Sequence, residues 1–269
     1  MKRKVIIDCD PGIDDALALM LALNHEDIEV LGITIVCGNA PAEMGFANAH
    51  KVLAHLGRQD VKVYLGAKQP LALPFCDALD THGSDGLGES FLPQTDAAIL
   101  DLDAVTFLSQ TLHDTNCSII PLGPLTNIAH AVRIEPRIIP KIKEIVYMGG
   151  GFRVGNKTAL AEFNVWLDPE AAQAVLDCNI PFTFVTLDAT HSAYVTMEDA
   201  ARFRAIGTRP AEVVASLCEQ RIAGYGEWQK VADVPAAPVH DPLTIAYLVD
   251  PTVITDIEDA PCVVDCGRG

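Results

Sequence analysis

Short runs of apolar, mostly β-branched residues alternate along this chain with longer segments of helical periodicity. Six of these runs have the length of strands and few polar positions; they span residues 5–9, 30–37, 61–65, 118–122, 144–148 and 182–187. Nearly continuous apolar strands are typical of parallel sheets that helices cover on both faces. The pattern therefore predicts an α/β fold with a mostly parallel, doubly wound sheet and helices on both of its faces.

The segments between these runs have the periodicity of helices. The predicted helices span residues 14–24, 42–56, 104–114, 125–133, 169–178, 197–206, 210–230 and 242–248. No repeat, low-complexity tract or Gly/Ser-rich linker divides the sequence. We therefore predict a single domain over residues 1–269.

The charge balance narrows the classes of function. The 269 residues contain 19 Lys and Arg against 36 Asp and Glu, which gives a formal charge of −17. Nucleic-acid surfaces need clustered basic side chains, so we expect no nucleic-acid partner. The longest apolar run, residues 16–23, is far shorter than a membrane span of roughly 20 residues. Because Asp8 interrupts the apolar start of the chain where a signal peptide needs its apolar region, we expect a cytoplasmic protein without membrane association.

The strongest chemical signal is a group of four carboxylates within eight residues, directly after the first predicted strand. Asp8 and Asp10 alternate at the end of that strand, and Asp14 and Asp15 begin the next helix. In doubly wound sheets, ligands bind beyond the carboxyl ends of the strands. A helix N-terminus offsets only ~0.3–1 kcal/mol of repulsion per carboxylate, whereas a divalent cation would hold all four together. Hard oxygen donors without neighbouring His favour Ca²⁺ or Mg²⁺ over zinc.

Eight motifs, taken in order along the chain, resemble those of the inosine–uridine-preferring nucleoside hydrolases. The first is the acidic segment, Asp8-Cys9-Asp10-Pro11-Gly12-Ile13-Asp14-Asp15-Ala16. The others are Gly38-Asn39, Thr81-His82-Gly83, Gly123-Pro124-Leu125-Thr126-Asn127, Met148-Gly149-Gly150, Glu162-Phe163-Asn164, Asp168-Pro169-Glu170-Ala171-Ala172 and His240-Asp241-Pro242. The resemblance covers essentially the whole chain. It implies a Rossmann-like fold, a tightly bound Ca²⁺, a homo-oligomer (tetramer or dimer) and hydrolysis of the N-glycosidic bond of ribonucleosides.

The resemblance also implies a role for each matching residue. The Ca²⁺ ligands would be Asp10, Asp15, the backbone carbonyl of Thr126, and Asp241. Asp10 would also be the general base that takes a proton from the water attacking the anomeric carbon, because the metal lowers the pKa of that water. His240 would protonate the leaving base.

The remaining matching residues would contact the nucleoside. Asp14, Asn39 and Asn164 would hold the 2′- and 3′-hydroxyls, Asn156 and Glu162 would face the 5′-hydroxyl, Met148 would lie against the ribose, His82 would line the base pocket, and Tyr225 would close over the base. Such contacts favour a distorted, oxocarbenium-like ribose and therefore count most in the transition state.

Two finer expectations also rest on the resemblance. Residues 188–191 and 202–207 are most similar to the pyrimidine-preferring bacterial branch, so uridine or cytidine should be better substrates than inosine. Family members generally continue past the point where this sequence stops, at Cys266-Gly267-Arg268-Gly269, with a further strand and a closing helix. The domain over residues 1–269 is therefore expected to lack those two elements.

Two other functions remain open from the residues. An Asp-x-Asp motif after a first strand is similar to that of the haloacid-dehalogenase phosphatases, in which Asp8 would be the nucleophile and Mg²⁺ the cofactor; here, however, Pro11-Gly12-Ile13-Asp14 follows instead of a small residue and Thr or Val. A non-catalytic ligand-binding protein on the same fold is the second alternative. Turnover of nucleosides separates the first hypothesis from both.

Overall fold

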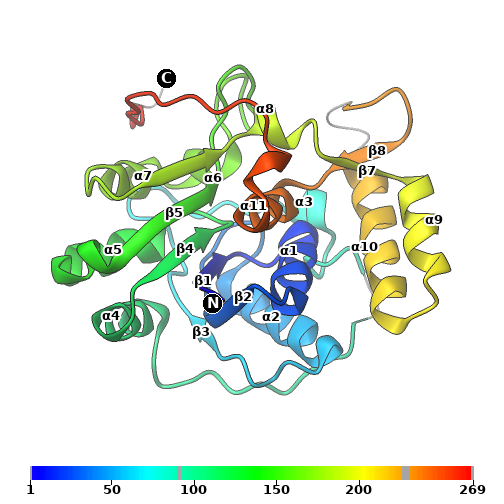
Figure 1. Cartoon of the computed structure of the whole chain (residues 1–269), viewed down its shortest axis with the longest axis horizontal. Helices are drawn as coiled ribbons and strands as arrows, with labels where there is room; N and C mark the ends of the chain where they lie inside the picture. Colours follow the sequence, from blue (N-terminus) through cyan, green and yellow to red (C-terminus); the bar gives the residue numbers. More distant parts are fainter. Residues whose placement is uncertain (1, 90–91, 226–230, 268–269) are drawn as a thin grey trace.

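A central six-stranded sheet organises the computed structural model of this chain, which describes residues 2–89, 92–225 and 231–267 (Figure 1). The strands are β1 (Arg3–Cys9), β2 (Ile28–Ile35), β3 (Val63–Leu65), β4 (Cys117–Pro121), β5 (Ile142–Met148) and β6 (Phe182–Val185). They lie in the order β3-β2-β1-β4-β5-β6, and each neighbouring pair is parallel. The predicted α/β class and all six predicted strands are confirmed.

Helices cover both faces of the sheet (Figure 1). One face carries α1 (Ile13–Asn24), α2 (Ala42–Leu56) and α11 (His240–Val249), and the other carries α4 (Ala104–Asp114), α5 (Thr126–Ile134) and α7 (Pro169–Leu176). The strand side chains alternate between the two cores: Val5 and Ile7 pack on the first, and Ile6 packs on the second. Both orientations are buried, which explains why the strands are apolar at almost every position.

Several short elements were not predicted. They are α3 (Leu79–His82), η1 (Pro136–Lys141), α6 (Phe163–Leu167), α8 (Leu187–Thr190) and η2 (Pro251–Val253), together with the strands β7 (Tyr194–Thr196) and β8 (Ala236–Pro238). The last two form a separate antiparallel pair. Elements of three to six residues span too little chain to display a helical or strand period.

A pair of helices projects to one side of the sheet, α9 (Met197–Ala205) and α10 (Arg209–Tyr225), drawn in yellow in Figure 1. The predicted helix over residues 210–230 is confirmed as far as Tyr225, and its last five positions lie outside the described residues. The C-terminal end of α10 meets α3, so this peripheral helix reaches the central part of the molecule.

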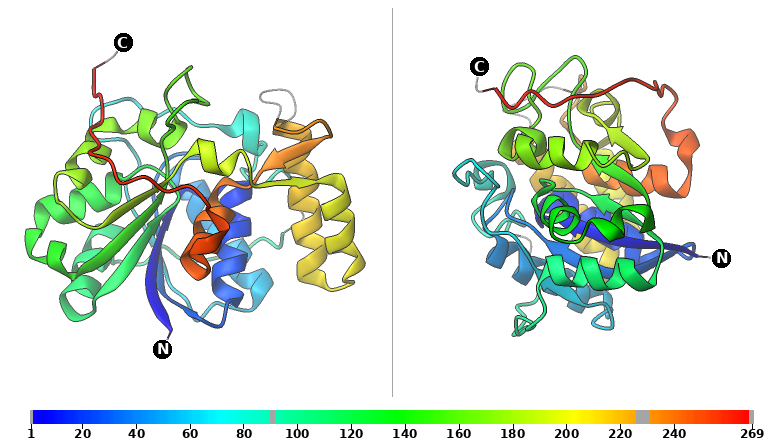
Figure 2. Two further views of the ribbon diagram at one scale, coloured as in Figure 1. Left: turned by 45° about the horizontal axis from the view of Figure 1, so that its top comes forward. Right: turned by 90° about the vertical axis from the view of Figure 1, so that its left-hand side faces the viewer.

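The segment after α11 crosses from one face of the sheet to the other (Figure 2). Ile254 packs against the core that contains α1, whereas Val264 packs against the core that contains α7. The backbone N–H of Val264 donates a hydrogen bond to Gln173 Oε1 on α7, at 2.7 Å. Apart from η2, the described residues that follow α11 contain neither helix nor strand.

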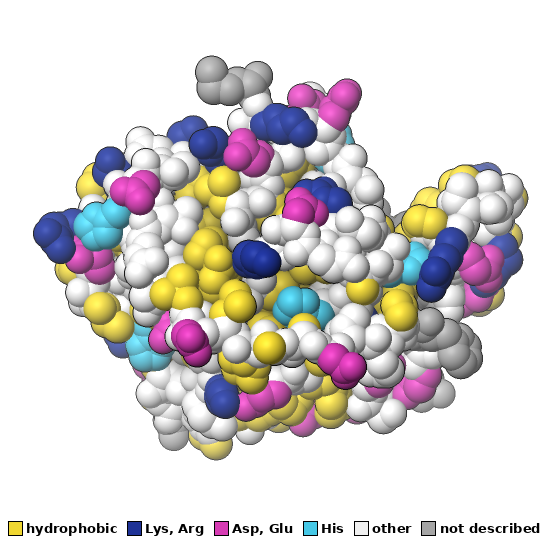
Figure 3. All heavy atoms as spheres, turned by 90° about the horizontal axis from the view of Figure 1, so that it is seen from below, with side chains coloured by type: hydrophobic (Ala, Val, Ile, Leu, Met, Phe, Trp, Pro, Cys, Tyr) yellow, Lys and Arg dark blue, Asp and Glu magenta, His cyan; other side chains and the backbone are white. Residues whose placement is uncertain are grey.

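The surface seen from below in Figure 3 carries acidic and basic side chains scattered around hydrophobic ones, without a basic stripe across that face. This distribution agrees with the excess of acidic over basic residues in the sequence. Among the helices of the described residues, none combines the length and the apolar character that a bilayer crossing requires.

Candidate active site

The polar residues of interest gather at the carboxyl ends of β1 and β4, the two central strands. The chain leaves β1 toward β2 and leaves β4 toward β5, so the connections diverge at this point of the sheet. Such a divergence opens a crevice at the carboxyl edge, where doubly wound folds bind ligands. The predicted site residues lie at the ends of strands, in the loops that follow them, or at the ends of helices: Asp10, Asp14, Asp15, Asn39, His82, Thr126, Met148, Asn156, Glu162, Asn164, Tyr225, His240 and Asp241.

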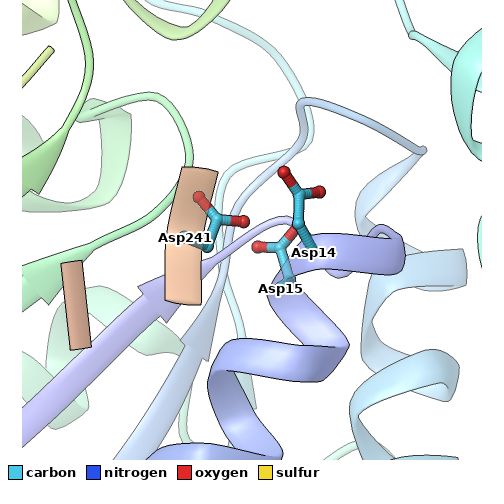
Figure 4. Close-up of side chains that lie close together, drawn as sticks. All are labelled: Asp14, Asp15 and Asp241. Atoms are coloured by element: carbon cyan, nitrogen blue, oxygen red, sulfur yellow. The ribbon is translucent and has the colours of Figure 1, made fainter. Parts of the chain in front are cut away.

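Three carboxylates converge between α1 and α11 (Figure 4). Asp14, Asp15 and Asp241 each offer an oxygen within 4.8 Å of the others, and all three side chains are buried. Burial, followed by the charge of Asp14, raises the pKa of Asp15 to about 6. Burial, followed by the charges of Asp14, Asp15 and Asp10, raises the pKa of Asp241 well above its ordinary range. Burying several ionised carboxylates side by side costs free energy. The cluster is therefore more stable when it binds a cation or when one of its carboxylates is protonated.

Asp10 adjoins this cluster through Asp15, although it is not within the same 4.8 Å group. Its backbone N–H donates to Asp15 Oδ1 at 3.2 Å, and its Oδ2 accepts from the backbone N–H of Asn39 at 2.6 Å. Its Oδ1 is buried without a hydrogen-bond partner among the described residues. A Cβ at Gly38 or Gly123 would lie 1.9 Å or 2.5 Å from the Asp10 carboxylate oxygens, so both glycines make room for this carboxyl group.

These residues fit a hard divalent cation. The donors are carboxylate oxygens, and two of them, Asp10 Oδ1 and Asp14 Oδ1, are buried without a hydrogen-bond partner in the described part of the chain. Ca²⁺ and Mg²⁺ take such oxygen ligands, whereas zinc sites are built mainly from Cys and His. Thr126 begins α5 nearby, and its hydroxyl donates to Asp168 Oδ2 at 2.6 Å. This hydrogen bond fixes the Thr126 side chain away from the carbonyl that the resemblance assigns to the metal.

Arg221, a residue that sequence reasoning did not select, forms an ion pair with Asp14. Its Nη2 donates to Asp14 Oδ2 at 2.9 Å, and its Nη1 lies 3.5 Å from His82 Nε2. Burial opposes ionisation of Asp14, but Arg221 and the two site histidines hold its pKa below the ordinary value. His82 accepts the N–H of Ile13 at Nδ1, and burial together with Arg221 lowers the pKa of His82 to about 4. His82 therefore stays neutral near pH 7 in this structure.

His240 lies among ring side chains at the start of α11. Its Nδ1 is 2.7 Å from the Thr190 hydroxyl, and the ring centroids of Tyr225 and His191 are each 5.9 Å away. Burial, followed by the charge of Arg221, lowers the pKa of His240 to about 3. His191 also belongs to this group, since its Nε2 lies 3.4 Å from the Tyr225 hydroxyl.

A second group of site residues surrounds α6. Glu162 accepts the backbone N–H groups of Gly150, Asn164 and Val165, at 3.0, 2.9 and 3.2 Å. Burial nevertheless raises the pKa of Glu162 to about 7. The Glu162 carboxylate therefore caps α6 and fixes the turn that follows β5, in addition to any contact with a ligand.

Asn164 and Asn156 complete this second group. Asn164 Nδ2 donates to the carbonyls of Leu122 and Met148, at 2.7 and 3.1 Å, and so ties α6 to the ends of β4 and β5. Leu122 is followed by Gly123, one of the two glycines that pack against the Asp10 carboxylate. The group around α6 therefore adjoins the carboxylate cluster. Asn156 lies at the exposed rim, where its Oδ1 accepts the N–H of Phe163 at 2.8 Å.

Asp8 belongs to a buried hydrogen-bond network between neighbouring strands. Its side chain is fully buried, and its Oδ1 accepts from Thr34 Oγ1 at 2.5 Å and from Asn127 Nδ2 at 2.8 Å. Asn127 also accepts the N–H of Ala67 at 2.8 Å, so the network joins β1, β2 and the loop after β3. The Thr34 and Asn127 hydrogen bonds give Asp8 a structural role between the strands, although Asp10 is equally buried.

One signal in the sequence would have identified Arg221. The buried positions Leu217, Cys218, Ile222 and Tyr225 form the apolar stripe of α10, and Arg221 falls within that stripe. An arginine on a buried helix face needs a partner, which here is Asp14. The partner itself could not be read from the pattern, because it lies 207 positions away along the chain.

Comparisons with known proteins agree on one family. The family model described as "Inosine-uridine preferring nucleoside hydrolase" matches residues 5–269. A protein of that name from Leishmania major is 40% identical over 259 residues, covering 95% of this chain and 81% of that protein. The pyrimidine-specific ribonucleoside hydrolase RihA of Shewanella woodyi is also 40% identical over 259 residues, covering 95% and 82%. Among solved structures, a plant nucleoside hydrolase superposes with a TM-score of 0.89 at 33% identity, covering 95% of this chain and 81% of that one.

Proposed function

Since the chain belongs to the family of inosine–uridine preferring nucleoside hydrolases, we propose that it hydrolyses the N-glycosidic bond of ribonucleosides to a free base and ribose. The observation that carries this proposal is the set of buried carboxylates at the carboxyl edge of the sheet, Asp14, Asp15 and Asp241 beside Asp10. Such a set suits a cation and a sugar with vicinal hydroxyls, both of which present groups that bind to carboxylate oxygens.

The proposed cofactor is Ca²⁺, held by Asp10, Asp15, Asp241 and the carbonyl of Thr126. When bound, this ion would supply a positive charge that binds the ribose hydroxyls and lowers the pKa of the attacking water. The buried Asp10 Oδ1, which has no hydrogen-bond partner in the described part of the chain, supports a ligand role for this carboxylate. Ca²⁺ accepts 6–8 oxygens in variable geometry, which suits a site built from loops and helix starts.

In this mechanism Asp10 accepts a proton from the water that attacks the anomeric carbon. The Asn39 N–H that binds Asp10 Oδ2, together with the tight packing of Gly38 and Gly123, keeps the carboxylate in one orientation. Asp14, Asn39 and Asn164 hold the 2′- and 3′-hydroxyls, and Glu162 and Asn156 lie toward the 5′-hydroxyl. Met148 lies against the ribose ring. These fixed groups orient the sugar and select the ribose that carries both hydroxyls.

The base is proposed to leave toward His82, Tyr225 and His240. His240 would assist by donating a proton to the leaving base, with Thr190 holding the ring through Nδ1. Burial and the charge of Arg221 lower the pKa of His240 to about 3, so the transfer requires that the bound base favour the protonated ring. We also propose a preference for pyrimidine nucleosides, which rests on the likeness to the pyrimidine-specific relative.

The decisive experiment measures release of free base and ribose, in the presence of Ca²⁺, from uridine, cytidine, inosine and adenosine and from their 2′-deoxy analogues. We expect turnover of the ribonucleosides, highest for uridine or cytidine. The deoxy analogues should be very poor substrates, because loss of the 2′-hydroxyl leaves buried polar groups unpaired. Equal kcat/KM for uridine and deoxyuridine would contradict the proposed ribose contacts, and preference for inosine would contradict only the pyrimidine assignment.

The same assay distinguishes the alternatives. A phosphatase would release phosphate from a monoester and lose that activity in Asp8→Asn, whereas a ligand-binding protein would bind nucleosides without cleaving them. A homo-oligomer is part of the proposal, and light scattering after size-exclusion chromatography measures its mass. A mass of one chain would contradict this part alone.

A further inference from the structure

Arg221 is the only buried arginine among the described residues, and its environment is not that of a simple structural ion pair. The side chain is 3% exposed. One nitrogen, Nη2, binds Asp14, and another, Nη1, faces His82 at 3.5 Å. The third, Nε, is buried and has no hydrogen-bond partner in the described ranges. A buried guanidinium retained only as a counter-ion would be expected to have all its donors satisfied, because each unsatisfied donor costs stability.

The groups around Arg221 indicate where its guanidinium lies in the site. Tyr225 lies on the same side of α10, and the Arg221 guanidinium carbon is 5.3 Å from the centre of its ring. Tyr225 in turn packs against His240, and His82 packs against the start of α1. Arg221 therefore lies between Asp14, which is proposed to bind ribose, and the residues that are proposed to surround the base.

We propose that Arg221 binds the nucleobase of the substrate and stabilises the negative charge that the base acquires as the glycosidic bond breaks. This inference rests on the proposed hydrolase function. The class of substrate that it favours has a carbonyl oxygen next to the glycosidic nitrogen, as the 2-carbonyl of uracil and cytosine does. A guanidinium suits this task because its charge is permanent and its N–H donors form a planar fork.

The electron balance of the step is simple. The C1′–N bond breaks, and its electron pair passes to the base nitrogen and is delocalised onto the carbonyl oxygens. The water oxygen forms the new bond to C1′ and gives one proton to Asp10. The departing base takes up a proton at nitrogen, which His240 is proposed to donate, and the proton on Asp10 returns to solvent while His240 is reprotonated. Arg221 keeps all its protons and contributes a hydrogen bond that strengthens as negative charge accumulates on the base.

The test compares leaving groups in Arg221→Gln and Arg221→Lys, with Ca²⁺ present. Uridine needs stabilisation of its departing base, whereas p-nitrophenyl riboside releases a stable anion. We expect Arg221→Gln to reduce kcat/KM for uridine by about 10- to 100-fold more than that for p-nitrophenyl riboside, the loss of one charged hydrogen bond to the base, because any loss through the Asp14 ion pair is common to both ribosides. Arg221→Lys, which keeps the charge without the fork, should recover part of the loss.

The matched control is Arg209→Gln, an exposed arginine at the start of the same helix, which should leave both substrates unaffected. An equal loss on uridine and p-nitrophenyl riboside would overturn the proposal, because Arg221 would then act on the sugar through Asp14. Unchanged turnover of uridine would overturn it as well. If Arg221→Gln does not fold, the same test is made with Arg221→Lys, by comparing its ratio of kcat/KM for uridine and for p-nitrophenyl riboside with that of the wild-type protein.

A binding measurement separates this inference from the proposed hydrolase function. If the wild-type protein cleaves no riboside, the function fails, and calorimetric titration with uridine and with ribose still tests the contact. Arg221→Gln should weaken uridine binding by about tenfold more than ribose binding, because the Asp14 ion pair bears on both ligands alike. Equal affinity of wild type and variant for uridine would overturn the contact irrespective of turnover.

Discussion

Asp10 is the residue on which the proposed chemistry depends most directly. We expect Asp10→Asn to lower kcat by at least a thousandfold, because the change removes both the proton acceptor and a negatively charged ligand (roughly 4 kcal/mol of transition-state stabilisation). Steady-state kinetics with uridine measures this loss. The matched control is Asp8→Asn, two positions earlier, which keeps the Oδ1 acceptor for Thr34 and Asn127 and should retain most of the activity. Retention of more than about a tenth of kcat in Asp10→Asn would refute the assigned role.

Glu162 gives a prediction about pH. Its pKa in the folded protein is about 7, against an ordinary value of 4.5, so folding favours its protonated form. Its contribution to the free energy of unfolding is therefore complete below pH 4.5 and is lost as the pH rises through 7, a decline of roughly 3 kcal/mol. Urea denaturation of wild type and Glu162→Gln at pH 5 and pH 8 measures the change. The variant should lack this part of the decline, and parallel pH dependence in both proteins would contradict the assignment.

His240 gives a prediction about acid catalysis. His240→Ala should slow uridine hydrolysis by about 100-fold, the usual range for loss of a proton donor, because the leaving base then departs without a proton. The same variant should hydrolyse p-nitrophenyl riboside nearly as fast as wild type. Thr190→Val, which removes the hydroxyl at 2.7 Å from Nδ1, should give a smaller defect with the same selectivity. An equal loss on both substrates would make His240 a binding or structural residue.

At the scale of elements, the helices that cover the sheet away from the carboxyl edge should affect stability and not catalysis. Asp103 caps α4, and its Oδ1 accepts the N–H of Thr106 at 2.7 Å. We expect Asp103→Ala to lower the free energy of unfolding by about 1 kcal/mol, because one N–H of the first turn loses its acceptor. Asp103→Asn should recover most of this loss. Thermal unfolding and uridine kinetics test both variants, and a fall in kcat beyond about twofold would contradict the separation of α4 from the site.

At the scale of the whole molecule, cation binding should be coupled to folding. Asp14, Asp15 and Asp241 come from the starts of α1 and α11, which are far apart in sequence and in contact in the fold, so the cluster exists only in the folded chain. A cation at 100 times its Kd stabilises the folded state by about 2.7 kcal/mol, which raises the Tm by about 5 °C. Calorimetry with Ca²⁺, with Mg²⁺ and with a chelator measures this shift.

The control for this coupling lies on α11 itself. Asp241→Asn should remove most of the Ca²⁺-induced rise in Tm, because it deletes a ligand at the start of the helix. Asp250→Asn, at the exposed C-terminal end of the same helix, should retain the full rise. The predicted coupling between Ca²⁺ binding and folding would be contradicted if both variants showed the same Ca²⁺-induced rise in Tm as the wild-type protein.

Local pattern was sufficient for the sheet and for part of the site. Strand and helix periods involve neighbours a few positions apart, so all six strands of the sheet and the long helices followed from the sequence. The acidic segment was visible for the same reason, since Asp10, Asp14 and Asp15 are close along the chain. Its place at the carboxyl end of β1 followed from the topology of parallel sheets.

Contacts between distant elements depended on the packing of the complete fold. The pairing of Arg221 with Asp14 and the approach of His191 to Tyr225 join α10 to α1 and to the end of α8. No local period encodes such contacts, because they depend on how the elements pack in three dimensions. The β7–β8 pair was missed for the same reason. Each of these strands has three residues, which is too short for a recognisable pattern, and each is defined by its hydrogen bonds to the other.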